Sequence, residues 1–276
     1  MTGPRETTTP DTAASATETL GTVALDLTPA PGAVPLRRMI SAQTLYELRT
    51  TLRNGEQLLL TLVIPVVLLV LFATTSLLDL GDGRRVDFLA PGVLALAVMS
   101  TAFTGQAIGT GFERRYGVLK RLGATPLPRS GLVAAKTLTV LMVEALQAAA
   151  ICAVALALGW RPGGDPFSVI VLLLLGTAAF SGFGLLMAGT LRAEATLAAA
   201  NLVYVLLLAA GGVVFPLDEF PAPVRDVLEM LPIAALAEGL RDVLRDGAAL
   251  PGGPVIILVV WAVAGLALAA RFFRWE

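Results

Sequence analysis

The chain has 276 residues, of which 56% are hydrophobic and 15% charged, and its formal net charge is −1. Soluble domains carry about a quarter of charged residues, so this composition excludes an ordinary soluble protein, and the near-zero charge gives no basic field to attract nucleic acid. Histidine is absent and Cys152 is the only cysteine, which excludes an internal disulfide and a metal site built from Cys and His.

The chain opens with a polar segment, residues 1–35, that is rich in Thr, Ala and Pro. It holds no apolar run long enough for a signal-peptide core and too little apolar surface to fold. We therefore expect a disordered cytoplasmic tail, followed by a transmembrane domain over residues 36–276.

Residues 36–54 carry leucine and isoleucine at roughly helical spacing, with four arginines nearby. The pattern is typical of an amphipathic helix that lies in the membrane interface. A soluble cytoplasmic helix shows the same weak periodicity, so that alternative stays open.

Six apolar runs are long enough to cross a bilayer as helices, which takes about 20 residues. They cover residues 57–78, 89–111, 134–158, 169–191, 197–215 and 254–273. With a cytoplasmic N-terminus, thirteen of the Lys and Arg residues fall on the cytoplasmic side and six outside, leaving Arg5 aside. This excess follows the positive-inside rule. We therefore predict an all-α, multi-pass protein of the plasma (inner) membrane with six transmembrane helices, N-in and C-in.

The segment between the fifth and sixth runs is acidic and contains several prolines. Residues 224–230 and 234–244 have helical patterns, and Leu231-Pro232 separates them because the residue before a proline disfavours helix. We expect a short helical hairpin on the outer side of the membrane, with its carboxylates facing solvent.

Between the second and third runs, residues 113–122 are expected to form one short helix on the cytoplasmic side. Tyr116, Leu119 and Leu122 would share a face of this helix, and Pro126 would stop it. A short, stiff helix with an apolar face can dock into a groove on another protein. The alternative is a basic loop that only fixes the topology.

This loop also resembles a known family. Its sequence Glu-Arg-Arg-Tyr-Gly-Val-Leu-Lys-Arg-Leu-Gly-Ala-Thr-Pro-Leu is similar to the ERExGTLxxLxxTPL pattern of ABC-2 type transporter permeases, which include membrane subunits of bacterial drug exporters. The similarity continues, in order, through Arg53-Asn54, Pro65, Leu89-Ala90-Pro91-Gly92, Gly212-Val213-Val214-Phe215-Pro216-Leu217 and Gly239-Leu240-Arg241. It departs at Arg115-Tyr116, where many members have an acidic residue followed by Gly-Thr.

The resemblance implies the permease subunit of an ATP-driven exporter. Two permease copies, expected to be identical, would pair with two ABC ATPase subunits that bind ATP and Mg²⁺, and no cofactor would bind this chain. This fits the lack of a Gly-x-x-x-x-Gly-Lys-Ser/Thr phosphate loop in the sequence. The residues implied to couple the permease to the ATPase are Glu113, Arg114, Gly117, Leu119, Leu122, Thr125 and Pro126, with Arg192 after the fourth run.

Polar side chains inside the runs are candidates for a translocation path. They are Gln106, Glu144, Gln147, Asn201 and Tyr204. Glu144 and Gln147 lie one turn apart on one helix face, where they could contact a cationic or polar cargo. Alternatively, a protonated or hydrogen-bonded Glu144 joins helices inside the bundle. The glycines of the fourth run predict close helix contacts.

The residues fit two other classes of membrane protein less well. A self-sufficient secondary carrier favours two related halves and charges at the midplane, and the sequence has one such charge, Glu144, and no evident repeat. An intramembrane enzyme needs a nucleophile with a base, or metal ligands, within the spans, and the sequence has no histidine and a lone Glu144 there.

Overall fold

The computed structural model describes residues 34–55, 59–75, 84–213, 216–217 and 220–273, so the predicted tail lies almost wholly outside the described part. The described residues form helices and contain no strand, which confirms the all-α prediction for them. In chain order the elements, with η marking a π-helix, are α1 (Leu36–Arg53), η1 (Leu59–Val63), α3 (Ile64–Thr74), α4 (Arg85–Val98), η2 (Met99–Gly105), α5 (Gln106–Arg115), α6 (Val118–Gly123), α7 (Arg129–Ala157), α8 (Pro166–Thr190), α9 (Ala193–Ala210), α10 (Ala222–Glu229), α11 (Pro232–Leu244) and α12 (Gly252–Phe272).

Five helices are long and apolar enough to cross a membrane. They are Arg85–Arg115, Ser130–Ala157, Pro166–Thr190, Ala193–Ala210 and Gly252–Phe272. The first predicted run is a shorter apolar helix, Thr61–Thr74, and residues 57–58 and 76–78 of that run lie outside the described part. Five of the six predicted runs are therefore confirmed as helices of spanning length.

The helix Arg85–Arg115, made of α4, η2 and α5 in succession, is the centre of the bundle. In its most apolar stretch 89% of the residues are buried, against 17% for α9 and 22% for α12. Small residues such as Ala90, Gly92 and Ala95 are buried along it and let neighbouring helices approach closely. The exposed apolar side chains of α9 and α12 are typical of helices that face lipid.

α8 and α12 make the most extensive helix contact in the structure, and two glycines make it possible. A Cβ added to Gly182 would lie 2.6 Å from the backbone carbon of Gly265, and one added to Gly265 would lie 2.9 Å from the ring of Phe183. The prediction that glycines of the fourth run mark close helix contacts is confirmed at Gly182.

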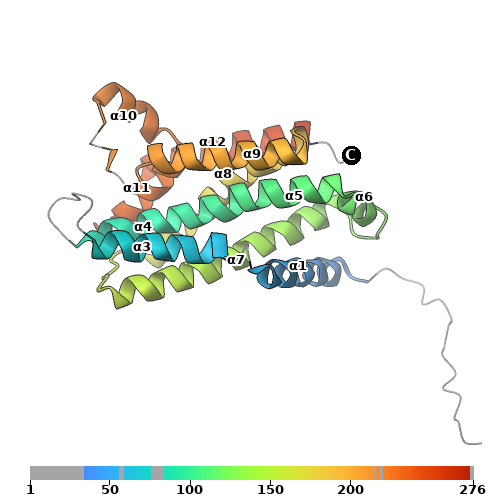
Figure 1. Cartoon of the computed structure of the whole chain (residues 1–276), viewed down its shortest axis with the longest axis horizontal. Helices are drawn as coiled ribbons and strands as arrows, with labels where there is room; N and C mark the ends of the chain where they lie inside the picture. The colour runs from blue at the N-terminus through green and yellow to red at the C-terminus, as the bar shows by residue number, and fades with distance from the viewer. Residues whose placement is uncertain (1–33, 56–58, 76–83, 214–215, 218–219, 274–276) are drawn as a thin grey trace, which may run out of the picture. The chain divides into compact units, whose positions relative to one another are not determined.

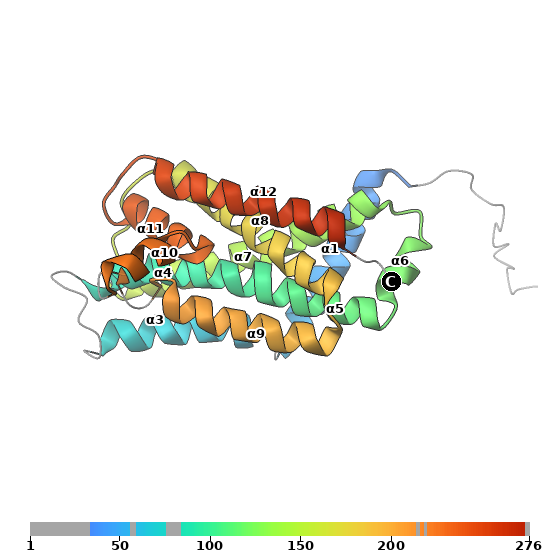
Figure 2. The same cartoon turned by 90° about the horizontal axis from the view of Figure 1, so that it is seen from above.

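The two views in Figures 1 and 2 place α10 and α11 at one end of the long helices and α1 and α6 at the other. The predicted pair of helices is confirmed, because α10 ends at Glu229 and Pro232 is the first residue of α11. α11 packs against α4, α8 and α12, while its carboxylate Glu238 is exposed, as expected for the carboxylates of this segment. Ile233, Leu236 and Leu240 are fully buried, because their helical spacing gives α11 an apolar face.

Arg241 fixes α11 to the central helix. Its side chain is buried and donates hydrogen bonds to the carbonyl oxygens of Gly212 (2.6 Å), Val213 (3.1 Å) and Phe88 (3.3 Å). The guanidinium also lies 3.8 Å from the centre of the Phe88 ring, within range of a cation–π contact. Gly92 leaves the room for this arrangement, because a Cβ there would lie 2.4 Å from the Val213 oxygen.

Asp165 caps the N-terminus of α8, and its removal gives a pH-dependent prediction. Its carboxylate accepts a hydrogen bond from the Ser168 amide at 3.0 Å, and backbone hydrogen bonds from Phe167 and Ser168 lower the pKa of Asp165. Because the pKa of Asp165 is lower in the folded chain than in the unfolded chain, where it is about 4, the ionised carboxylate stabilises the fold at pH values above that of the unfolded chain. This stabilisation is lost as the pH falls through the pKa of the folded chain. Asp165→Ala should therefore lower the Tm of the detergent-purified protein at pH 7, and the difference from wild type should shrink below about pH 4.

Asp165→Asn is the matched control, because asparagine keeps an acceptor oxygen for the cap. We expect this variant to retain most of the wild-type Tm at pH 7. Equal Tm values for wild type and Asp165→Ala at pH 7 would contradict the assigned cap.

Candidate functional site

The loop between the second and third runs contains a break that the sequence pattern does not predict. α5 continues from the spanning helix to Arg115, and α6 begins only at Val118. Gly117 between them has a φ of +69°, a left-handed conformation that glycine adopts readily and that commonly ends helices. The expectation of one helix over residues 113–122 is therefore wrong, and Glu113 and Arg114 belong to the end of the spanning helix.

Arg114 joins this break to the turn between α8 and α9. Its guanidinium donates to the carbonyl oxygen of Gly189 at 2.6 Å and to that of Leu191, which are among the last carbonyls of α8 and lack partners within their own helix. Arg115 forms an ion pair with Glu194 in the first turn of α9. The two turns are thus held together by side chains of the predicted coupling segment and its neighbour.

The predicted apolar face of the coupling helix is divided by the break. Leu119 is buried with 3% exposure, whereas Tyr116 is 65% exposed. Leu122 is half-buried, and Thr125 donates to its carbonyl oxygen at 2.6 Å. Five exposed residues of this segment are here called the α6 surface: Tyr116, Lys120, Arg121, Thr125 and Pro126. Arg192, also exposed, lies at the start of α9.

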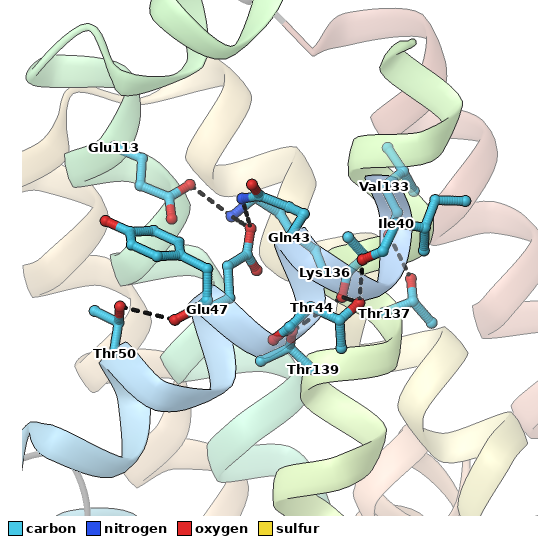
Figure 3. A network of polar contacts seen from close by, with 12 residues as sticks. Ile40, Gln43, Thr44, Glu47, Thr50, Glu113, Val133, Lys136, Thr137 and Thr139 are labelled. Carbon is cyan, nitrogen blue, oxygen red and sulfur yellow. Dashed lines mark hydrogen bonds and ion pairs between the residues drawn. The ribbon is translucent and has the colours of Figure 1, made fainter. Parts of the chain in front are cut away.

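Glu113 is part of a network that ties α5 to α1 and α7 (Figure 3). Lys136 of α7 donates to Glu113 at 2.6 Å and lies 3.5 Å from Glu47 of α1. Gln43 donates to the same Glu47 oxygen at 2.8 Å. The Lys136 and Glu47 side chains are only 12% and 13% exposed, and burial, opposed by the charge of Lys136, raises the pKa of Glu47.

α1 is a helix, as predicted, and it packs along α7. Thr44, the buried residue of α1, donates to the carbonyl oxygen of Ala135, and Thr139 donates to that of Thr44, each at 3.4 Å. Sequence reasoning missed Glu47 and Lys136 as members of the site. A signal existed for Lys136, because it is an ionisable residue inside the predicted third run.

A cavity of about 580 Å³ opens between α1, α5 and α7, next to this network. Glu47, Glu113, Lys136 and Gln106 line it. Gln106 is 8% exposed, and its side-chain oxygen has no hydrogen-bond partner among the described residues. Of the predicted path residues, Gln106 is the one that lines this cavity.

Glu144 and Gln147 instead join helices. Thr177 of α8 donates to Glu144 at 2.6 Å, and Gln147 accepts from Thr101 at 2.9 Å and donates to the Thr61 carbonyl oxygen at 2.6 Å. These contacts link α7 to α8, η2 and η1, as the helix-joining alternative for Glu144 describes. The second oxygen of Glu144 has no partner among the described residues, and both residues line a smaller, apolar cavity of about 150 Å³.

The remaining two candidates lie on α9, away from both cavities. Asn201 is exposed, and the half-buried Tyr204 is hydrogen-bonded to Ser100. Neither lines the cavity that Gln106 lines. The structure therefore does not bring the five predicted path residues together within this single chain.

Comparison with known proteins places the chain in a family. The ABC-2 type transporter family matches residues 40–244, so the chain belongs to this family of multi-pass membrane proteins and is of the permease type. The linearmycin resistance permease protein LnrN of Bacillus subtilis (strain 168) is 30% identical to it over 186 residues. The alignment covers 66% of this chain and 47% of LnrN, so the matched region is about half of that relative.

Proposed function

We propose that this chain is the permease subunit of an ATP-driven exporter and that the α6 surface, with the turn between α8 and α9, binds a separate ABC ATPase subunit. ATP and Mg²⁺ would be bound by that partner. The observation that supports the proposal is the pair of hydrogen bonds from Arg114 to Gly189 and Leu191, reinforced by the Arg115–Glu194 ion pair. A displacement of either turn would therefore move the other turn as well. An element that connects an ATPase to the transmembrane helices needs this property.

The central helix is the element suited to transmit that displacement across the membrane. It contains α4, η2 and α5 without interruption, and its parts pack against α3, α7, α8, α9 and α11. Interfaces of close-packed helices change between discrete arrangements rather than deforming continuously. In our proposal, movement of α6 shifts α5 and thereby changes how the central helix packs on its neighbours.

The proposal includes six spans with both termini in the cytoplasm and a functional unit of two permease copies, with lipid around them. The exposed Lys120 and Arg121 then lie on the cytoplasmic side, in accord with the positive-inside rule.

LnrN carries linearmycin resistance in its name, and for this chain we propose the broader role of exporting a compound harmful to the cell.

The direct test is association with a candidate ATPase. Lys120→Glu/Arg121→Glu should weaken co-purification and permease-dependent ATP hydrolysis by on the order of tenfold, because reversing charges on a docking surface readily costs more than about 1.4 kcal/mol. Glu113 and Leu119 are unsuitable test positions, since one is ion-paired inside the chain and the other is buried.

Glu229→Lys on α10 is the matched control, because it also reverses the charge of an exposed residue but lies at the opposite end of the bundle. It should leave association unchanged. Failure of wild type to associate with any candidate ATPase would favour a self-sufficient secondary carrier instead.

A further inference from the structure

The cavity between α1, α5 and α7 has the size of a ligand site. Its volume of about 580 Å³ lies within the range of about 300–1,000 Å³ that small-molecule sites occupy. The aromatic residues Tyr46, Phe112 and Tyr116 form part of its wall, and aromatic faces attract cations.

The charge at one end of the cavity is unbalanced. Two carboxylates, Glu47 and Glu113, and one ammonium, Lys136, are the side chains among its described lining residues that carry a charge at neutral pH. Lys136 is 2.6 Å from Glu113 but 3.5 Å from Glu47, and the second partner of Glu47, the Gln43 amide at 2.8 Å, carries no charge. The charge of Glu47 is therefore the less completely compensated of the two. A buried carboxylate without full compensation of its charge is costly, and burial, with the nearby charge of Glu113, raises the pKa of Glu47 against the opposing effect of Lys136.

An unused acceptor lies at the other end. The Gln106 oxygen is buried and has no hydrogen-bond partner among the described residues, whereas such groups are nearly always paired. Gln106 and Glu113 are seven residues apart on α5, which places them on one face at a separation of about 10 Å along the helix.

We infer that this cavity binds an elongated organic cation, with a protonated amine at Glu47 and Glu113 and a hydroxyl or N–H donor at Gln106. The ammonium would complete the charge balance of the Glu47–Lys136–Glu113 network, and the donor would satisfy the Gln106 oxygen. Aliphatic parts of the ligand would lie along Val140, Val143 and the aromatic wall.

The binding site is defined by contacts within this chain, and only its use as a site for exported cargo depends on the proposed function. A phosphatidylethanolamine headgroup also offers an ammonium. Its phosphate would bring a negative charge next to Glu47 and Glu113, and like charges there are unfavourable. We therefore assign the site to a cationic solute rather than to this lipid.

The test is calorimetric titration of the full chain in phosphatidylcholine nanodiscs, with three probes of matched length. 8-Aminooctan-1-ol carries the proposed pair of groups, octane-1,8-diol lacks the charge, and 8-hydroxyoctanoic acid reverses it. We expect the amine to bind at least about tenfold more tightly than either of the others. Equal binding of the three probes would overturn the inference.

Three variants locate the binding. Glu47→Gln and Gln106→Leu should each weaken binding of the amine by on the order of tenfold. Gly109→Leu should abolish it without lowering the Tm, because Gly109 lines the cavity and a Cβ there meets nothing within 4 Å. If the amine binds Gly109→Leu and Gln106→Leu as it binds wild type, the cavity is not the site.

The lipid is distinguished by repeating the titration in nanodiscs that contain phosphatidylethanolamine. Unchanged binding of the amine supports a solute site, and loss of binding would show that the lipid headgroup occupies the cavity, contrary to the inference. A chain that binds the amine but no ATPase would retain this site and lose the proposed function. If the chain binds an ATPase but not the amine, the proposed function stands and the cation site is refuted.

Discussion

Replacing Arg241 with methionine is expected to cause the largest loss of stability of any single substitution considered for this protein. The variant would leave the carbonyl oxygens of Gly212, Val213 and Phe88 without the donor that they share. Each buried acceptor left unpaired costs about 1–3 kcal/mol. Burial lowers the pKa of Arg241 to about 10, so the side chain is still charged at neutral pH and its hydrogen bonds are charge-assisted.

Thermal unfolding of the purified protein in detergent would measure this loss. Arg241→Lys should be intermediate, because lysine keeps the charge but not the planar fork that reaches several acceptors at once. Arg245→Met is the matched control, since Arg245 follows α11 and is half exposed, and it should change stability by no more than about 0.5 kcal/mol. Equal Tm values for the two methionine variants would contradict the role assigned to Arg241.

Substitution of Gly182 by alanine is the second change with a large expected effect. The new Cβ would lie 2.6 Å from both the Gly265 carbon and the Leu266 nitrogen. Because these are backbone atoms, no side-chain rotation relieves the clash and α8 must move away from α12. Overpacking of this kind costs about 1–3 kcal/mol, so we expect a clear decrease in Tm.

Gly109→Ala is the control for this prediction, because Gly109 is also inside a helix but its added Cβ would meet nothing within 4 Å. It should be neutral or slightly stabilising, since alanine favours helix over glycine by about 1 kcal/mol. If Gly182→Ala unfolds at the wild-type temperature, α8 and α12 do not pack as closely as the structure has them.

Much of the architecture could be predicted because it depends on local pattern. Long apolar runs identify helices of spanning length whatever their neighbours are, and Leu231-Pro232 separates α10 from α11 by local sterics. The sequence around Gly117, in contrast, is helical on both sides, and periodicity does not reveal that this glycine takes a left-handed conformation. The π-helices η1 and η2 were missed for the same reason.

The candidate site was harder to predict because its contacts join distant segments. Lys136 pairs with Glu113, which lies 23 residues before it in the sequence, and with Glu47 of α1. Arg241 belongs to the segment that was predicted to form an acidic helical hairpin, and its burial results from the tertiary packing of α11. The helical spacing of Ile233, Leu236 and Leu240 was the signal that α11 enters the bundle.

The central claim is that the α6 surface contacts a separate ATPase on the cytoplasmic side. The most direct measurement is site-specific cross-linking in cells that express the full chain with its candidate ATPase. Cys152 is the only native cysteine, so Cys152→Ala gives a background in which Arg121→Cys or Glu229→Cys carries a photo-cross-linker. Our account predicts an adduct with the ATPase from position 121 and none from position 229. An adduct from position 229, or none from position 121, would contradict it.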